Sequence, residues 1–295
     1  MQQLSLKHIA LWVLLLLSTL PIYSQTTPPT YRIAACDWMM LKRQKLGEFK
    51  LAHELGADGV EVDMGGLGKR VLFDNQLREP QQAEKFQAAA RQYGVAVPSM
   101  AMSGFFAQSF LTRDNYQDLL KDCFLTMKLF GSKVAFLPLG GSGKDWQQEG
   151  CAAYLQMVSR LRTAGEMAKQ EGITIGIRTG MDAKFDKKLL KKVGSSQIKV
   201  YYNFQDAADH HRDICKELRK LGARRIVQIH ASNTDSVNLQ EDPEINLPKI
   251  RKTLDKMKWS GWLVVERSRD VKRVRDVKYN FGRNIAYLKQ VFQER

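Results

Sequence analysis

Cysteine is scarce in this chain of 295 residues, which carries four, at Cys36, Cys123, Cys151 and Cys215. No two of them stand in a C-x-x-C spacing, and they form no dense framework. The sequence therefore argues against a scaffold built from disulfides. Isolated cysteines are most often small buried apolar residues, and a single disulfide remains open if the compartment is oxidising.

Long apolar runs are also missing, except for Ile9 to Leu20 (IALWVLLLLSTL). This run is shorter than the ~20 residues that a membrane-spanning helix needs, and no cysteine follows it to take a lipid anchor. Lys7 and His8 precede it, and Ser24 gives a small residue after it, which is typical of a signal peptide. We predict a signal peptide at 1–24, a short linker at 25–30 and a periplasmic or secreted mature chain without an integral membrane segment. A short retained anchor is the alternative.

Several common catalytic motifs are absent. The segment Gly140 to Lys144 fails as a phosphate loop, because Pro138 stands where the first glycine is needed and Asp145 follows the lysine. The run Gly65 to Arg70 does not match the dinucleotide-binding fingerprint, since no glycine falls at the third glycine position of that pattern. There is no G-x-S-x-G and no H-E-x-x-H. These absences argue against nucleotide-binding and serine or zinc hydrolase chemistry of the familiar kinds.

Acidic residues are fewer than basic ones, with 31 Asp and Glu against 46 Lys and Arg, and the formal net charge is +15. The positive residues are mostly interspersed along helix-like segments, which is typical of solvated helix faces. The same charge would also attract anionic surfaces, polymers or substrates. We do not expect a nucleic-acid partner, because export would remove it and no aromatic-basic recognition motif is present.

What the chain does contain is a regular alternation of short apolar runs and longer helical stretches. The expected strands are 32–36, 59–63, 95–102, 133–139, 173–179, 198–203, 225–230 and 262–267. The expected helices are 45–55, 81–93, 115–130, 152–170, 185–193, 207–221, 247–258 and 280–292. Eight such repeats predict one (β/α)₈ TIM barrel over residues 31–295. An open doubly wound sheet is the alternative.

Four strands in the second half end on different polar residues, namely Arg178, Asn203, His230 and Glu266. Residues two apart on a strand share a face, and each of the first three lies opposite the apolar face of its strand. Because parallel strands deliver their last residues to one end of a barrel, these four side chains are expected at a common mouth. Glu61 and Asp63 share a face of the second strand, so one or both should enter the mouth as well.

The strand-end segments YRIAACDWMM, GVEVDMG, VAFLPLG, QIH and LVVERSRD together resemble the sugar phosphate isomerase/epimerase family of xylose-isomerase-like barrels. Metal-dependent members of that family have Glu, Asp, His and Glu as metal ligands on the fifth to eighth strands, and the resemblance implies a site at the same positions here. His230 and Glu266 match this set, whereas Arg178 and Asn203 replace the two acidic ligands. The resemblance therefore implies a degenerate metal site, with at most a weakly bound Mn, Mg, Co or Zn ion at His230 and Glu266.

These observations favour an exported isomerase or epimerase that transfers a proton beside the carbonyl of a sugar or keto-sugar. Arg178 would stabilise the carbonyl oxygen in place of a cation, Glu266 or Glu61 would act as base and His230 as acid. The residues assigned to substrate binding are Trp38, Glu61, Met102, Asn203, Asn233 and Arg269, with Phe105 and Trp146 as further apolar walls.

The alternative function is a carbohydrate-binding pseudoenzyme that kept the barrel and lost the metal. A multi-zinc endonuclease of the same barrel type is set aside, because only one histidine ends a strand. The expected partner is a small sugar, and homo-oligomer formation is left open.

Overall fold

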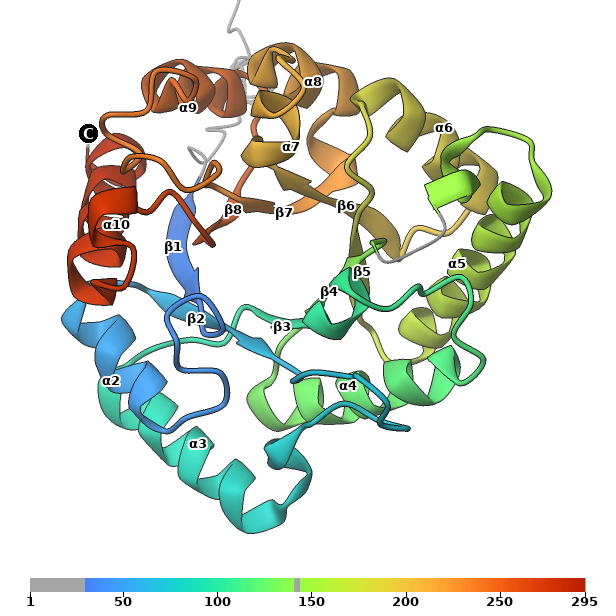
Figure 1. Ribbon diagram of the computed structural model, residues 1–295, viewed down its shortest axis with the longest axis horizontal. Coiled ribbons are helices and arrows are strands. Elements are labelled where there is room, and N and C mark those ends of the chain that lie inside the picture. Colours follow the sequence, from blue (N-terminus) through green and yellow to red (C-terminus); the bar gives the residue numbers. More distant parts are fainter. Residues whose placement is uncertain (1–29, 141–143, 295) are drawn as a thin grey trace, which may run out of the picture.

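The computed structural model describes residues 30–140 and 144–294 and forms a closed barrel of parallel strands in the order β1 to β8, ringed by helices (Figure 1). The predicted signal peptide at 1–24 and all but the last residue of the predicted linker at 25–30 lie outside these ranges. The strands are β1 Tyr31–Cys36, β2 Gly59–Asp63, β3 Ser99–Ala101, β4 Val134–Pro138, β5 Thr174–Arg178, β6 Ile198–Asn203, β7 Ile226–His230 and β8 Gly261–Val265. The predicted (β/α)₈ TIM barrel is confirmed.

The helices follow the strands in the predicted alternation. They are α2 Gly47–Glu54, α3 Pro80–Tyr93, α4 Tyr116–Phe130, α5 Ala152–Gln170, α6 Ala183–Val193, α7 Phe204–Ala208, α8 Ile214–Leu221, α9 Leu247–Lys256 and α10 Val277–Phe292. Short 3₁₀ helices lie at η1 Gln76–Arg78, η2 Ser103–Phe106, η3 Lys144–Gln147, η4 Ala223–Arg225 and η5 Val271–Arg273. In the described part of the chain, no helix is long and apolar enough to cross a membrane.

Two elements differ from the prediction for local reasons. The third strand is limited to β3, because Pro98 lacks an N–H for the ladder and Met102 leaves the extended region with φ −90° and ψ 55°. The helix expected at 207–221 is two helices. His211 between them has φ 52°, and the Asp213 side chain accepts from the Lys216 N–H to start α8.

Alternating side chains separate two buried layers. The apolar residues of each strand that face outward pack under the helices in one large cluster, including Ile175, Ile177, Val200 and Ile229. A small cluster fills the barrel itself and contains Ala34, Cys36, Ala101, Phe136, Tyr201 and Val264. Because Tyr201 and Val264 point inward, Asn203 and Glu266, two residues further on, also turn toward the barrel axis.

All four cysteines are free thiols. Cys36, Cys123 and Cys215 are buried, and Cys151 is half-buried. This agrees with the interpretation of isolated, small apolar side chains.

Candidate active site

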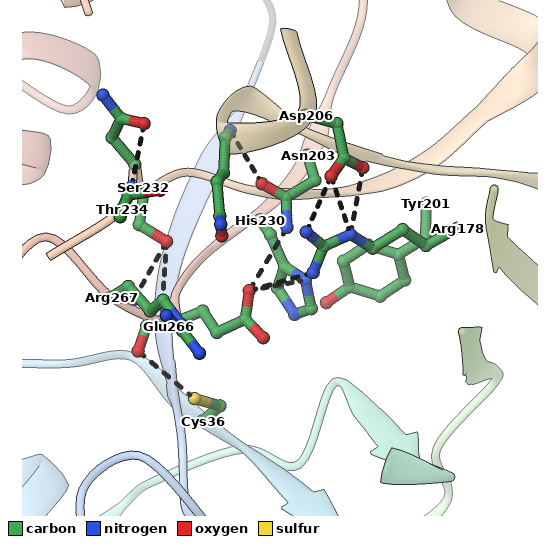
Figure 2. A network of polar contacts seen from close by, with 12 residues as sticks. Cys36, Arg178, Tyr201, Asn203, Asp206, His230, Ser232, Thr234, Glu266 and Arg267 are labelled. Atoms are coloured by element: carbon green, nitrogen blue, oxygen red, sulfur yellow. Dashed lines mark hydrogen bonds and ion pairs between the residues drawn. The ribbon is translucent and has the colours of Figure 1, made fainter. Parts of the chain in front are cut away.

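The structure brings the four polar strand-end residues together around one carboxylate oxygen, Oε2 of Glu266 (Figure 2). Asn203 Nδ2 donates to this oxygen at 3.2 Å, and Arg178 Nη1 lies 3.5 Å away. His230 Nδ1 approaches it to 3.7 Å from the third side. The mouth predicted from the strand ends is therefore a compact group of contacting side chains.

Arg178 is held at the mouth by a second acid that sequence analysis did not assign to the site. Its Nη2 donates to Asp206 Oδ1 at 2.7 Å and its Nε to Asp206 Oδ2 at 2.9 Å, a two-pronged ion pair. Its guanidinium carbon also lies 5.6 Å from the ring centre of Phe106. Burial lowers the pKa of Arg178, but Glu266 and Asp206 raise it more, and the pKa ends above its ordinary value.

Glu266 remains ionised in this setting although it is almost completely buried. Burial raises the pKa of its carboxyl, but the electrostatic interactions with His230 and Arg178 lower it more, so the pKa lies below its ordinary value. Among the described residues no hydrogen bond is made to its second oxygen, Oε1, whereas Oε2 is surrounded. Oε1 is thus the oxygen with capacity to accept a proton from a ligand.

Beneath Glu266, a second carboxylate, Glu61, anchors His230. His230 Nε2 lies 2.8 Å from Glu61 Oε1, while Ser99 Oγ and Tyr201 Oη donate to Glu61 Oε2 at 2.7 and 2.6 Å. Gln228 Nε2 donates to both hydroxyls at 2.9 Å. The hydroxyl hydrogens therefore point to Glu61, which acts as the acceptor, and this assigns the Nε2 hydrogen to His230.

His230 is left with one free ring nitrogen that faces Glu266. Nδ1 is buried without a hydrogen-bond partner among the described residues. The ring is fixed by Tyr201 and Phe136, with ring centres at 4.4 and 4.7 Å, and by Trp38 at 6.3 Å. Nδ1 can therefore hold a proton toward Glu266 or offer a lone pair at the same place.

The other expected site residues divide between the mouth and its surroundings. Trp38 is half-buried and contacts the histidine from the β1 side. Met102 and Phe105 are fully buried in the layer under the helices, so they lie behind the wall of the mouth. Trp146 is also buried and packs with Phe185, 5.9 Å between ring centres.

Asn233 and Arg269 stabilise the loops after β7 and β8. Asn233 Nδ2 donates to Asp242 and Glu244, each at 3.0 Å. Arg269 forms a two-pronged ion pair with Asp235, with Nη2 at 2.6 Å from Oδ2. Both side chains are engaged by protein atoms, so their predicted contact with a substrate requires those bonds to be exchanged.

Asp63, at the end of β2, is buried apart from His230 and Glu266. It accepts from the N–H and the hydroxyl of Ser103, at 3.2 and 2.7 Å, and pairs with Arg43 at 2.6 Å. Burial raises the pKa of both Asp37 and Asp63, and the charge of Asp63 raises that of Asp37 further. This acidic pair holds the loop after β1 against the loop after β2 through Gln44, whose N–H donates to Asp37 at 2.9 Å.

The residues at the mouth do not fit a divalent cation. Among the described residues, no group of three or more His, Cys, Asp or Glu side chains has the geometry to hold one. The space beside Glu266 Oε2 is taken by the Arg178 guanidinium, whose permanent charge would repel an ion at that distance. Asn203 presents its amide hydrogen, rather than its oxygen, to Glu266.

Sequence analysis missed Asp206, Phe106, Tyr201 and Ser99 as members of this site. Tyr201 shares the inward face of β6 with Asn203, so the strand alternation contains the signal that finds it. Asp206 and Phe106 lie in α7 and η2, immediately after strands, where position depends on the path of the chain. No periodic pattern in the sequence indicates that path.

Comparisons with known proteins agree with the architecture. The family model described as xylose isomerase-like TIM barrel matches residues 49–291. Similar solved structures include D-psicose 3-epimerase from Clostridium cellulolyticum H10, with TM-score 0.69, 13% identity and coverage of 88% of this chain and 99% of that one. The 3-keto-D-glucoside 4-epimerase of E. coli has TM-score 0.69, 14% identity and coverage of 88% and 100%.

A xylose isomerase domain protein from Planctomyces limnophilus has TM-score 0.66, 14% identity and coverage of 92% of this chain and 100% of that one. No functionally curated protein matches the sequence. At these identities the solved structures establish the fold alone, while the family model covers most of the chain. The chain therefore belongs to the xylose isomerase-like TIM barrel family.

Proposed function

We propose that this protein is a sugar isomerase or epimerase that moves a proton beside the carbonyl of a sugar or keto-sugar, with Arg178 in place of a metal cation. The observation that carries the proposal is the placement of a permanently charged guanidinium against Glu266, with His230 behind it. The similarity to sugar epimerases of the same fold supports the substrate class.

In the proposed reaction, Glu266 Oε1 takes the proton from the carbon beside the carbonyl. The electron pair of that C–H bond forms a carbon–carbon double bond, and the carbonyl oxygen becomes an enolate oxygen. Arg178 stabilises the negative charge on this oxygen, and His230 Nδ1 supplies a proton to it. For the isomer, Glu266 returns its proton to the former carbonyl carbon, while the hydroxyl on the adjacent carbon gives its proton to His230 Nδ1 and becomes the new carbonyl. For the epimer, solvent water protonates the original carbon from the opposite face, His230 Nδ1 takes back the proton from the oxygen, and Glu266 releases its proton to the resulting hydroxide.

In this scheme, much of the rate enhancement has to come from the stabilisation of the enolate charge by Arg178. Glu266 has a pKa below its ordinary value and is a weak base for a carbon acid. Glu61 is saturated by donors from Ser99, Tyr201 and His230, so it orients the histidine rather than taking the substrate proton. Its proposed role thus changes from substrate contact to positioning.

Access to His230 requires Arg178 to move. The side chains of His230 and Glu266 are 0% and 5% exposed, and that of Arg178 is 14% exposed. Asp206, on α7, offers Arg178 an anchor on the outer side of the mouth. A sugar that swings Arg178 away from Glu266, while the Asp206 pair persists, would reach both catalytic groups.

The second candidate function is sugar binding without turnover. It is favoured by the same ion pairs, because Arg178 fills the space between Asp206 and Glu266 and neutralises the base. In this case the barrel would present only Trp38, Phe106 and the loop residues to a carbohydrate.

Deuterium exchange separates the two candidates. The purified protein is incubated with a panel of ketohexoses and ketopentoses in D₂O with a chelator, and NMR follows deuterium uptake at the carbons beside the carbonyl. We expect uptake with the wild type and with Glu241→Gln, a surface control that pairs with Arg283, and a fall of about 10²–10⁴-fold in Glu266→Gln.

Sugar binding by calorimetry without any uptake would establish the second candidate. Uptake that requires an added divalent metal would overturn the assignment of Arg178 as the charge-stabilising group.

We also propose that the chain is exported, to the periplasm or the medium, on the strength of the apolar segment at 9–20. Fractionation of cells that produce the full chain and a form lacking residues 1–24 tests this. Retention of both forms in the cytoplasm would contradict it.

A further inference from the structure

A basic hollow lies at the end of the barrel opposite Glu266 and His230. It has a volume of about 810 Å³ and opens between α6, the loop before β6 and η4. Lys199 is the second residue of β6, and Arg224 and Arg225 directly precede β7, so the hollow adjoins the starts of the strands. We call it the basal groove, and its charged lining residues are Lys187, Lys188, Lys191, Lys199, Arg224 and Arg225.

The charges of the basal groove are almost uncompensated. Every charged residue that lines it is positive. Within residues 30–140 and 144–294, only Lys188 of the six forms an ion pair, with Glu149 at 2.6 Å. Arg225 donates to a neutral backbone carbonyl, that of Leu221, at 2.9 Å. The positive side chains of the groove therefore repel one another unless an anion binds between them.

The needs of the fold explain only part of this charge. Lys191 is in the last turn of α6, where a cation interacts favourably with the helix dipole. Lys187 is one turn earlier, where the like-charged Lys191 at i+4 is unfavourable. Lys199 and Arg224 belong to a strand and to η4 and have no such role in α6.

The rest of the lining favours a sugar polymer among anionic ligands. Ser195, Ser196 and Gln197 add hydroxyl and amide groups that can bond to sugar hydroxyls. No aromatic side chain lines the groove in the described part of the chain, so it lacks the stacking platform typical of single-stranded nucleic-acid sites. Its volume falls in the range of small-molecule sites, which suits a few sugar units in a recess better than a flat bilayer.

The basic character continues beyond the groove. A second hollow of about 670 Å³ at the same end of the barrel is lined by Arg32, Arg91 and Lys133. It includes Val227, two residues after Arg225 of the basal groove, so both hollows adjoin the start of β7. A chain of several sugar units that spanned both hollows would meet cations in each of them.

We propose that the basal groove binds an acidic polysaccharide, a polymer of carboxylated sugars, through its lysines and arginines. This inference is independent of the proposed catalytic function, because the groove shares no residue with the mouth. Binding at this end leaves Arg178 and Glu266 free to act on a small sugar.

The test compares two triple variants of the protein for binding to polygalacturonate by calorimetry, at low and moderate salt. The groove variant is Lys187→Glu, Lys191→Glu, Arg224→Glu. The control is Lys252→Glu, Lys256→Glu, Lys272→Glu, which lowers the net charge equally and includes the same i, i+4 lysine spacing on α9. We expect affinity to fall at least tenfold in the groove variant and less than about twofold in the control. Far-UV circular dichroism verifies that both variants are folded.

Three results would overturn the proposal. Equal losses in both variants would mean that net charge alone attracts the polymer. Tighter binding of polyuridylate than of polygalacturonate would assign the groove to nucleic acid, and tighter binding of phosphatidylserine vesicles would assign it to a membrane surface. Absence of binding to neutral dextran, together with weaker binding of polygalacturonate at higher salt, would support a site that recognises carboxylates by charge.

Discussion

Charged side chains are arranged differently at the two ends of this barrel. At the mouth, acids and bases lie close together and are mostly buried, and Arg178, Asp206 and Glu266 neutralise one another within hydrogen-bonding distance or close to it. At the base, the cations of the basal groove are mostly exposed and nearly all lack an acidic partner among the described residues. The charge of +15 is thus not a uniform property of the surface.

This difference shows which charges are fixed by the fold and which are available to partners. Buried ion pairs have high costs when one member is removed, whereas exposed cations contribute little to stability. Changes at the mouth should therefore alter folding and chemistry, whereas changes in the basal groove should alter binding and change stability by only a few tenths of a kcal/mol.

The largest expected effect is a gain of metal binding in Arg178→Glu. The substitution replaces a repelling charge with a carboxylate beside Glu266 and His230. Each pair of unit charges 4 Å apart interacts by roughly 4 kcal/mol at an effective dielectric constant of 20, and the substitution reverses the sign of this interaction. We expect affinity for Mn²⁺, Co²⁺ or Zn²⁺ to rise about a hundredfold or more, measured by calorimetry. Arg269→Glu, which makes the same change of charge in the loop after β8, is the control. Equal binding by the wild type would show that Arg178 does not block the position.

Next in size is the loss of stability in Arg178→Ala. It leaves Asp206 and Glu266 facing each other without a cation, and breaking a buried pair in this way costs about 3–5 kcal/mol. Lys191→Ala, at the base, should change stability by less than about 0.5 kcal/mol. Denaturant unfolding of both variants measures the contrast, and similar losses would contradict it.

Asp186, which accepts a hydrogen bond from Thr179 Oγ1 at 2.6 Å, should make stability depend on pH. Burial, together with Asp206 and Glu217 and despite the Thr179 bond, raises the pKa of Asp186 to about 7. An unfolded aspartate titrates near 4, so the folded chain binds the extra proton between about pH 4 and 7.

Stability from this group is therefore fully present below about pH 4 and is lost as the pH rises to about 7, by up to ~1.4 kcal/mol per pH unit. In Asp186→Asn this part of the slope should disappear. Thermal unfolding of wild type and variant across this range measures it, and parallel curves would refute the assignment.

A smaller loss of stability, about 1 kcal/mol, is expected for Tyr201→Phe. The substitution removes one hydrogen-bond donor to Glu61 and one acceptor for Gln228. If Glu61 orients His230, the pH profile of the exchange reaction should shift as well. Tyr202→Phe is the matched control, because the Tyr202 hydroxyl is buried without a partner among the described residues. The control should be neutral or slightly stabilising, and a loss in it equal to that of Tyr201→Phe would remove the distinction.

The smallest expected effect is a change in stability caused by a substitution in the basal groove. Lys187→Glu converts a repelling i, i+4 pair with Lys191 into an attractive one and should stabilise the fold by a few tenths of a kcal/mol. Lys187→Gln should give about half of that gain. Precise denaturant titrations can resolve both, and a loss of stability in either would mean that Lys187 has a partner in the fold.

The barrel was predictable because two signals are strong in this chain. They are the alternation of side chains along strands, as at 173–179, and the glycines that end helices, such as Gly94 and Gly131. The errors arose where one residue outweighed the pattern. Pro98 shortened β3, and the Asp213 cap began a new helix where an uninterrupted one was expected.

The site was predictable only in its strand-end part. Arg178, Asn203, His230 and Glu266 converge because a closed barrel brings parallel strand ends to one rim. The partner of Arg178, Asp206, and its aromatic neighbour, Phe106, come from connecting segments. Their positions depend on loop paths, which side-chain periodicity does not encode.

The pairing of β1 with β8 has a consequence for how the chain folds. Tyr31 lies beside Gly261 and Ala35 beside Val265, so the seam of the barrel joins residues 230 positions apart. During synthesis β1 emerges long before its partner, and its edge stays open until the last segment has been made. Contacts of such long range slow folding, and exposed strand edges favour aggregation. A ribosome stalled before residue 261 would therefore display an incomplete sheet, and the seam would be the last part of the molecule to acquire protection from hydrogen exchange.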